Sequence, residues 1–216
     1  IAIEGAHGLG KQNWEATLED LHRQGLSILG LAWSFSNQFA GSSGDNGGGL
    51  TALGRKLVES CRKMGIVIDL SHASSATVMD TCRNSPVPVI ASHSNAASVH
   101  AHARNLSDEE IRCIADTGGV IGLNFHRPFL GGGQDIAQVV AHANHIASVG
   151  GHQSVALGSD FDGLIQPAQG LATSAELSAL WSALRSSGWT RAQIDGLQGG
   201  NFYRAWNAAH TYAQSR

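Results

Sequence analysis

The sequence has little charge and no long apolar run. Charged residues make up 14% of its 216 residues, and the formal net charge is −3 with no cluster of lysine and arginine. A chain without a basic patch lacks the electrostatic feature that attracts nucleic acid or an anionic membrane. No apolar run approaches the roughly 18 residues that a transmembrane helix needs. We therefore expect no nucleic acid and no membrane partner, and a small neutral or zwitterionic ligand instead.

Cysteine is scarce and shows no metal-binding or disulfide spacing. Cys61, Cys82 and Cys113 fall in predicted helices without a C-x-x-C pair, so the sequence indicates buried thiols. The chain also lacks a basic and then apolar leader, and we expect a cytoplasmic protein. Because the chain begins at Ile1 rather than at methionine, we expect that it starts inside a longer protein.

Histidine, in contrast, is abundant, and two histidines follow short apolar runs. There are 11 histidines against 14 lysines and arginines. The runs at 66–70 and 87–91 each lead into a Ser-His pair, which places His72 and His93 after two predicted strands. The helix-like segment between the runs predicts a parallel strand-helix-strand unit. Two imidazoles at the carboxyl ends of neighbouring strands indicate a metal site.

Six predicted strands alternate with helices along the chain. Each strand ends in polar residues, and no glycine-rich phosphate-binding motif follows any of them. This pattern favours an α/β fold of the (β/α)8 TIM-barrel type over a doubly wound sheet. The predicted strands are 1–3, 27–31, 66–70, 87–91, 120–125 and 154–157. The predicted helices are 14–24, 51–64, the segment between His72 and 87, a helix after Ser107, 136–149, 177–184 and a last helix after Thr190.

The number of strands is smaller than a closed barrel requires. Such a barrel has eight strands and typically about 250 residues, whereas this sequence shows about six β/α units. An open arc would leave two unpaired strand edges. We therefore predict a single barrel domain over residues 1–216 whose first two β/α units are missing at the N-terminus.

Four side chains at predicted strand ends have the chemistry of metal ligands. Glu4, His72, His93 and Asp160 come from four different strands, and two imidazoles with two carboxylates suit zinc or a similar divalent ion. Each of them taken singly is more simply a solvated or hydrogen-bonded loop residue. Four at corresponding strand ends reverse that preference. Asn124, at another strand end, is a candidate for substrate contact.

Several motifs resemble one family of hydrolases. They are IEGAH at 3–7, VIDLSHAS at 67–74, PVIASHSNA at 88–96, the Arg104-Asn105 pair, LGSDFDG at 157–163 and GGNFYRAW at 199–206. In this order they resemble the membrane or renal dipeptidase family, peptidase family M19, and in particular its bacterial-type members. The resemblance covers essentially the whole chain.

The resemblance implies a binuclear zinc (β/α)8 metallo-dipeptidase that cleaves small dipeptides, in some members with a D-residue at the carboxyl side. It implies that Glu4 bridges two zinc ions and that His72 and His93 complete the second site. Asp160 would bind the first ion, take the proton of the bridging water and meet the substrate's amine. Arg104 would hold the substrate carboxylate, a task suited to its fork of donors.

The sequence departs from the family pattern at two places. The family carries an H-x-D pair on its first strand as the remaining ligands of the first ion, and only three residues precede Glu4 here. Renal-type members have a histidine after the strand at 27–31 that acts on the scissile carbonyl. The corresponding position here is Trp33, which indicates different pocket chemistry and makes Trp33 a substrate-binding candidate.

Two alternatives stay open at the level of sequence. The chain can be a non-catalytic metal-binding remnant that uses Glu4, His72 and His93, or another amidohydrolase-like enzyme acting on a lactone or cyclic amide. A homodimer is compatible with either. His142 and His145 share one face of a predicted helix, where packing or hydrogen bonding is the simpler role because barrel sites lie in loops.

Overall fold

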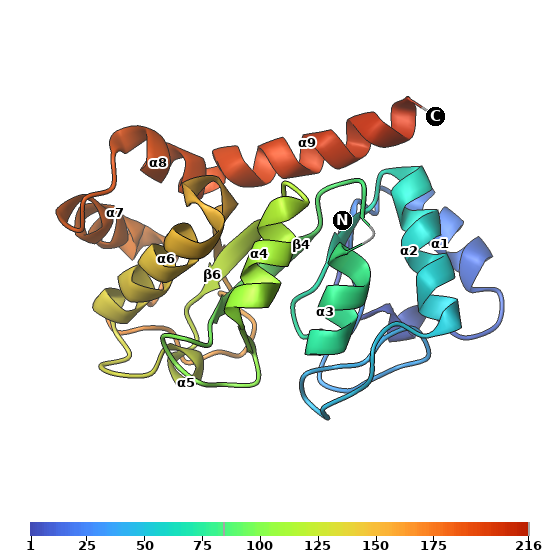
Figure 1. Ribbon diagram of the computed structural model, residues 1–216, viewed down its shortest axis with the longest axis horizontal. Helices are drawn as coiled ribbons and strands as arrows, with labels where there is room; N and C mark the ends of the chain where they lie inside the picture. Colours follow the sequence, from blue (N-terminus) through green and yellow to red (C-terminus); the bar gives the residue numbers. More distant parts are fainter. Residues whose placement is uncertain (84, 216) are drawn as a thin grey trace. The chain divides into compact units, whose positions relative to one another are not determined.

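The computed structural model describes residues 1–83 and 85–215 (Figure 1). Its strands belong to one sheet in the order β1-β2-β3-β4-β6-β7, with β5 paired to β4. Every pairing with an assigned register is parallel. The strands are β1 (Ala2–Ile3), β2 (Ile28–Gly30), β3 (Val67–Asp69), β4 (Ile90–Ala96), β5 (Asn105–Leu106), β6 (Val120–Asn124) and β7 (Val155–Ser159). The predicted α/β class with about six parallel strands is confirmed.

The helices follow the strands in the alternation that the sequence predicts. The α-helices are α1 (Trp14–Arg23), α2 (Ala52–Met64), α3 (Ser75–Cys82), α4 (Asp108–Asp116), α5 (Arg127–Leu130), α6 (Ile136–Gly150), α7 (Leu177–Ser186), α8 (Arg191–Asp195) and α9 (Asn201–Gln214). Shorter helices are η1 (Ala6–Leu9), η2 (His152–Ser154), η3 (Ser174–Glu176) and the π-helix η4 (Gly196–Gly200).

The chain divides into two compact units. Unit 1 contains residues Ile1–Ala91, Thr117–Gly119 and Arg204–Arg216, and unit 2 contains Ser92–Asp116 and Val120–Tyr203. The single barrel domain over 1–216 stays a prediction.

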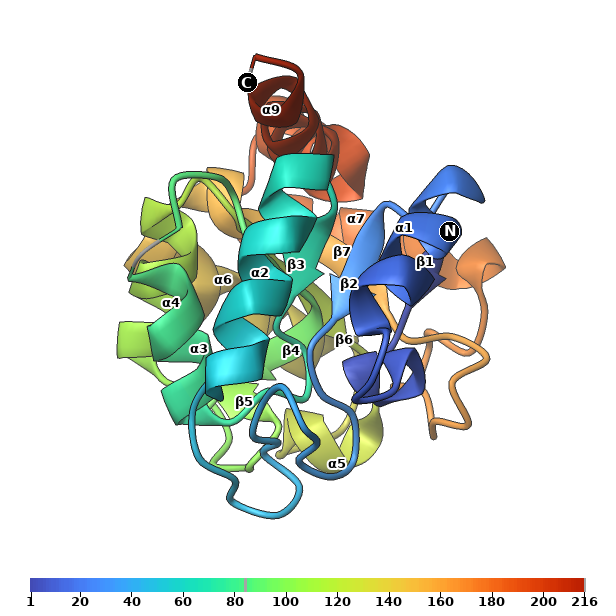
Figure 2. The same cartoon turned by 90° about the vertical axis from the view of Figure 1, so that its right-hand side faces the viewer.

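In unit 1, α2 packs on β3 and α1 packs on α2; Figure 2 shows α2 beside β3. The fully buried side chains of Leu18, Leu29 and Leu57 lie at the centre of this unit. The ends of α2 are set by local chemistry. Thr51 accepts a hydrogen bond from the Gly54 N–H, and Gly65 takes a left-handed φ of 74°, which glycine adopts without steric cost.

In unit 2, β6 and β7 pair in parallel, and α4 and α6 lie side by side (Figure 1). The predicted capping box at the start of α4 is present. The Ser107 N–H donates to Glu110 Oε2 at 2.6 Å, and the Glu110 N–H donates to Ser107 Oγ at 3.3 Å. Each bond gives a partner to a backbone N–H at the start of the helix, where no helical carbonyl can accept it. The second predicted box, from Thr190 to Gln193, opens α8.

Some predicted boundaries are wrong. The strand at 87–91 was expected to break before Ser92, but β4 runs from Ile90 to Ala96, and His93 therefore lies inside it. The strand continues because Asn95 and Ala96 pair with β5, a two-residue strand that the sequence pattern does not reveal. The helix after Thr190 was expected to be the last, yet α9 follows it across the π-helix η4.

Two expectations about composition can be compared with the structure. Cys61 in α2 and Cys82 in α3 are buried thiols, as predicted, whereas Cys113 in α4 is a thiol that is partly exposed, so its predicted burial is wrong. Burial raises the pKa of the Cys61 thiol well above its ordinary value. Across residues 1–83 and 85–215, every helix is too short or too polar to cross a bilayer.

Candidate metal centre

Glu4 stands at the carboxyl end of β1, directly after Ile3. The backbone turns there through Gly5, whose φ of 88° favours glycine. The neighbouring strand approaches closely because Gly30 lacks a side chain. A Cβ at Gly30 would lie 3.0 Å from the Gly5 nitrogen and 3.4 Å from the Glu4 Cα. The absence of a side chain at Gly30 thus allows the backbone at Glu4 and Gly5 to lie close to β2.

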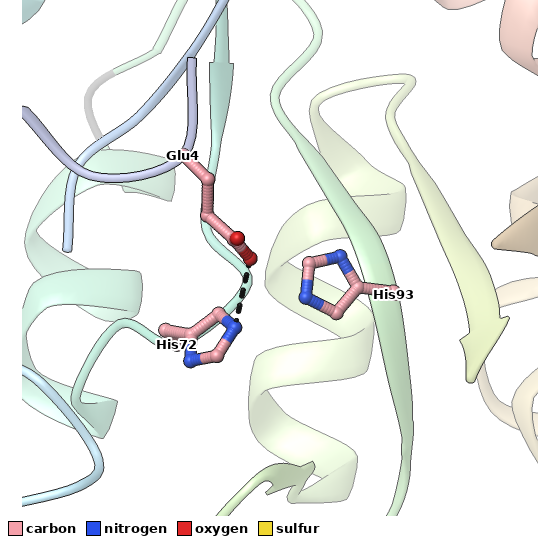
Figure 3. Close-up of side chains that lie close together, drawn as sticks. All are labelled: Glu4, His72 and His93. Atoms are coloured by element: carbon pink, nitrogen blue, oxygen red, sulfur yellow. Dashed lines mark ion pairs between the residues drawn. The ribbon is translucent and has the colours of Figure 1, made fainter. Parts of the chain in front are cut away.

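His72 follows β3 in a strained backbone conformation. The strand ends at Asp69, whose carboxylate accepts the Ser71 N–H at 2.9 Å. His72 then takes a left-handed φ of 69°, which costs a residue with a side chain on the order of 1 kcal/mol. The turn directs the ring toward Glu4, and His72 Nε2 lies 2.9 Å from Glu4 Oε1 (Figure 3).

His93 supplies a third ligand atom. Its Nδ1 shares a hydrogen bond of 2.8 Å with Ser92 Oγ. Glu4, His72 and His93 each offer one ligand atom, and these atoms all lie within 4.8 Å of one another (Figure 3). Two imidazole nitrogens and a carboxylate oxygen are a common donor set for zinc. The residues present therefore fit a zinc ion.

Asp160 and Asn124 form a second arrangement, within unit 2. Asp160 has a left-handed φ of 70° in the turn after β7, and Asn124 Nδ2 donates to its Oδ2 at 3.0 Å. Asn124 is itself fixed by Asn95, because each residue donates to the other, at 3.0 and 3.2 Å. These bonds fix the Asn124 backbone, and the His126 N–H donates to Asn124 Oδ1 at 2.6 Å, which orients the side-chain amide toward Asp160.

Arg104 lies on the connection between β4 and β5. It donates to the His93 carbonyl at 3.1 Å, and its guanidinium carbon lies 5.6 Å from the centre of the Phe129 ring. The His102 ring also packs on Phe129, at 4.5 Å between ring centres. Burial lowers the pKa of His102, and the positive charge of Arg104 contributes to the same shift. A neutral imidazole beside Arg104 does not compete with it for an anion.

Trp33 lies in unit 1, close to Gly5, the residue that follows Glu4. Its side chain is 48% exposed, and its Cβ would stand 3.2 Å from a Cβ placed on Gly5. Trp33 is thus beside the residue that follows Glu4. Its contact with substrate stays a prediction, as do the substrate roles of Arg104 and Asn124.

His142 and His145 have the structural roles that the sequence favours. The His142 ring is buried in unit 2 between the Ala96 N–H, which donates to Nδ1 at 3.2 Å, and the Leu130 carbonyl, 3.2 Å from Nε2. Burial lowers the pKa of His142 to about 4. His145 Nε2 lies 2.7 Å from an Asp108 oxygen.

Two residues near the site escape sequence reasoning. Ser42 places its hydroxyl 3.1 Å from the His72 carbonyl, and Phe129 lies beneath Arg104. Ser42 belongs to a glycine-rich segment that reads as a flexible loop, and Phe129 belongs to the four-residue helix α5. Neither carries a motif, since their importance comes from contacts with residues distant in the sequence.

The comparison with known families is decisive for the chain as a whole. The sequence model of the membrane dipeptidase family, peptidase family M19, matches residues 1–216. The chain belongs to this family. The predicted resemblance is confirmed.

Relatives of this dipeptidase family chain occur in bacteria and yeast. It is 34% identical over 215 residues to an uncharacterized protein in the pqqA 5′ region of Klebsiella pneumoniae, covering 94% of this chain and 78% of that protein. It is 32% identical to an uncharacterized dipeptidase of Schizosaccharomyces pombe, covering 99% of this chain and 53% of that protein. The chain thus spans between about half and three quarters of the length of these relatives.

Solved structures of the family match the fold. A metallo peptidase from Rhodobacter sphaeroides, liganded with a phosphinate mimic of the dipeptide L-Ala-D-Ala, is 35% identical with a TM-score of 0.87. The match covers 96% of this chain and 62% of that one. A probable dipeptidase from Pseudomonas aeruginosa, at 23% identity, has a TM-score of 0.90 and matches 98% of this chain and 69% of that one. The second match supports the fold alone.

Proposed function

We propose that this chain carries part of the active site of a zinc-dependent dipeptidase that hydrolyses small dipeptides. The convergence of Glu4, His72 and His93, with ligand atoms within 4.8 Å of one another, supports the proposal most strongly. Three side chains from β1, β3 and β4 meet in a chain of the dipeptidase family. A carboxylate beside two imidazoles offers three ligand atoms around one point, which the single pair of His145 with Asp108 does not.

The proposed zinc ligands in this chain are Glu4, His72 and His93, with Asp160 as a ligand of a first ion. A bound zinc ion supplies Lewis acidity, which lowers the pKa of a water ligand toward neutrality and polarises a peptide carbonyl. The H-x-D pair that the family places before the bridging carboxylate is not in this sequence. The proposal for this chain therefore rests on the group of three residues.

Asp160 is the proposed proton acceptor. A general base needs a fixed position within hydrogen-bond reach of the proton it takes. Asn124 Nδ2 donates to one carboxylate oxygen of Asp160 at 3.0 Å, and this bond fixes the position of the carboxylate. Asn124 in this picture orients the base rather than binding substrate directly.

Arg104 is the proposed site for the substrate's carboxylate. Its guanidinium is planar and always charged, and it can donate two parallel hydrogen bonds to a carboxylate. The ring of Phe129 and the bond to the His93 carbonyl fix its orientation. The dipeptide mimic bound to the Rhodobacter protein supports a dipeptide substrate, including one with a D-residue at the carboxyl side.

Hydrolysis of L-Ala-D-Ala by the protein that carries this chain tests the proposal. We expect turnover that a chelator abolishes and added zinc restores, and that His93→Ala eliminates. His145→Ala is the matched control, because His145 pairs with Asp108 outside the proposed site. Turnover that persists both in chelator and in His93→Ala contradicts the proposal.

A non-catalytic metal-binding protein is the second candidate. The three ligand atoms of Glu4, His72 and His93, within 4.8 Å of one another, are enough to hold an ion without any turnover. This candidate predicts zinc bound through Glu4, His72 and His93 without hydrolysis of any dipeptide. A panel of dipeptides, lactones and cyclic amides separates it from both hydrolase hypotheses.

A further inference from the structure

We propose that Ser42 is a positioning residue for the metal ligand His72, acting through the backbone carbonyl of His72. The inference rests on the proposed metal site and assigns a role to the glycine-rich segment at residues 34–49, here called the serine loop. All the contacts concerned lie within unit 1.

The Ser42 hydroxyl is the centre of a buried hydrogen-bond group. The residue is 0% exposed. Its Oγ lies 2.5 Å from the Trp33 carbonyl and 3.1 Å from the His72 carbonyl, and it accepts the Gly44 N–H at 3.1 Å. The single hydroxyl proton is shared between the two carbonyls, with the shorter contact to Trp33, and it thus links the segment after β2 to the turn after β3.

The His72 carbonyl has a second donor from the same loop. The Ser43 N–H donates to it at 2.8 Å. Two donors on one carbonyl matter at this position, because His72 has a left-handed φ of 69° that a residue with a side chain rarely adopts. Holding the carbonyl holds the φ and ψ angles of His72, and those angles set where the imidazole points.

Metal affinity is sensitive to small changes in ligand direction. Ligand distances must fall within about 0.2 Å of their preferred values, and partners that orient ligands are typically worth about 10- to 100-fold in metal affinity. Most such partners bond the other ring nitrogen of a histidine. Here the orienting contact is made to the main chain, and Ser42 and Ser43 both contribute to it.

The serine loop has further anchors that do not use the Ser42 hydroxyl. The Ser74 N–H donates to the Gly41 carbonyl at 2.9 Å, and Ser74 Oγ donates to the Gly48 carbonyl at 2.6 Å. Thr77 Oγ1 also bonds the Gly41 and Gly48 carbonyls, at 3.1 and 3.2 Å. Removing this hydroxyl should therefore leave the loop in place and take the shared Ser42 donor away from the His72 carbonyl, while the Ser43 N–H stays bonded to it.

Two alanine variants of neighbouring serines isolate the hydroxyl. Ser42→Ala removes the donor to the His72 carbonyl. Ser43→Ala keeps its donor, because Ser43 uses its backbone N–H. We expect zinc titration of the 216-residue chain to show about 10-fold weaker binding in Ser42→Ala and wild-type binding in Ser43→Ala. Equal losses in the two variants, or none in Ser42→Ala, would overturn the inference.

Hydrogen exchange in metal-free protein gives a second readout. The Ser43 N–H donates to the His72 carbonyl, which is also an acceptor of the Ser42 hydroxyl. The protection factor of this amide, corrected for the intrinsic rate of each sequence, should fall in Ser42→Ala and stay at the wild-type value in Ser43→Ala. Unchanged exchange at position 43 in Ser42→Ala overturns the role of Ser42. Absence of zinc binding in the wild type would instead refute the proposed metal site, and the exchange result would still decide the role of Ser42.

Discussion

His72 and His93, at or near strand ends, have different partners from His142 and His145 on α6. Both ring nitrogens of His142 contact backbone groups, and His145 contacts Asp108. His72 also meets a carboxylate, that of Glu4, but a second imidazole lies beside this pair: one ligand atom each from Glu4, His72 and His93 lies within 4.8 Å of the others.

The difference shows how one residue type serves two purposes in this chain. An imidazole between a backbone donor and a backbone acceptor satisfies groups that burial would leave costly. When an imidazole lies beside a carboxylate and a second imidazole, their lone pairs point to a common region. A cation can bind there. The partners of His142 therefore indicate a role in stability, whereas His72 and His93 are the proposed metal ligands.

The largest expected effect comes from removing one of the two imidazoles of the proposed metal site, His72 or His93. His72→Ala or His93→Ala should weaken zinc binding more than about 100-fold, since partners that only orient ligands are already worth up to about that much. His145→Ala should leave zinc affinity unchanged. Isothermal titration of the three variants measures the difference, and equal affinities would remove the distinction between the two groups.

The next effect concerns His142 and the pH dependence of stability. Its pKa is about 4 in the folded protein against about 6.5 in an unfolded chain. Between these values the unfolded state binds the proton, so the free energy of unfolding should fall as pH drops from 6.5 to 4, by about 3 kcal/mol in total.

Urea unfolding of the wild type and of His142→Gln at several pH values measures this contribution. The variant should lose most of the slope between pH 6.5 and 4, while His145→Gln should keep it. A wild-type slope retained in His142→Gln would show that other groups cause the pH dependence and that His142 is not held neutral by burial.

The smallest of the three effects is expected at Arg104. Lysine keeps the charge of Arg104 but not its fork of donors, so Arg104→Lys should weaken binding of L-Ala-D-Ala about 10-fold, the value of one charge-assisted hydrogen bond. Binding of the dipeptide's carboxamide should be weak in wild type and variant alike. An equal loss for both ligands would place the role of Arg104 outside carboxylate recognition.

The sequence predicts the alternation of strands and helices because each element carries its own signal. Apolar runs give the strands, and Thr51 with Gly65 or Ser107 with Glu110 give helix ends through contacts a few residues apart. Parallel strands bring their carboxyl ends to one edge of the sheet, which is why the sequence predicts that Glu4 and His72 lie close together.

The remaining features depend on contacts between distant residues. The length of β4 follows from its pairing with Asn105 and Leu106, and the role of Ser42 follows from a bond across 30 positions to His72. Glycine-rich composition predicts a flexible loop, but here it allows the chain to pack closely enough for the serine loop to reach the turn after β3. Sequence patterns over a few residues do not indicate which distant residues come into contact.

Zinc stoichiometry of the purified 216-residue chain tests the central claim most directly. The account predicts one zinc ion bound per chain through Glu4, His72 and His93, and none in the double variant His72→Ala/His93→Ala that keeps the wild-type circular dichroism spectrum. Failure of the wild type to bind zinc, or equal binding by the double variant, would contradict it.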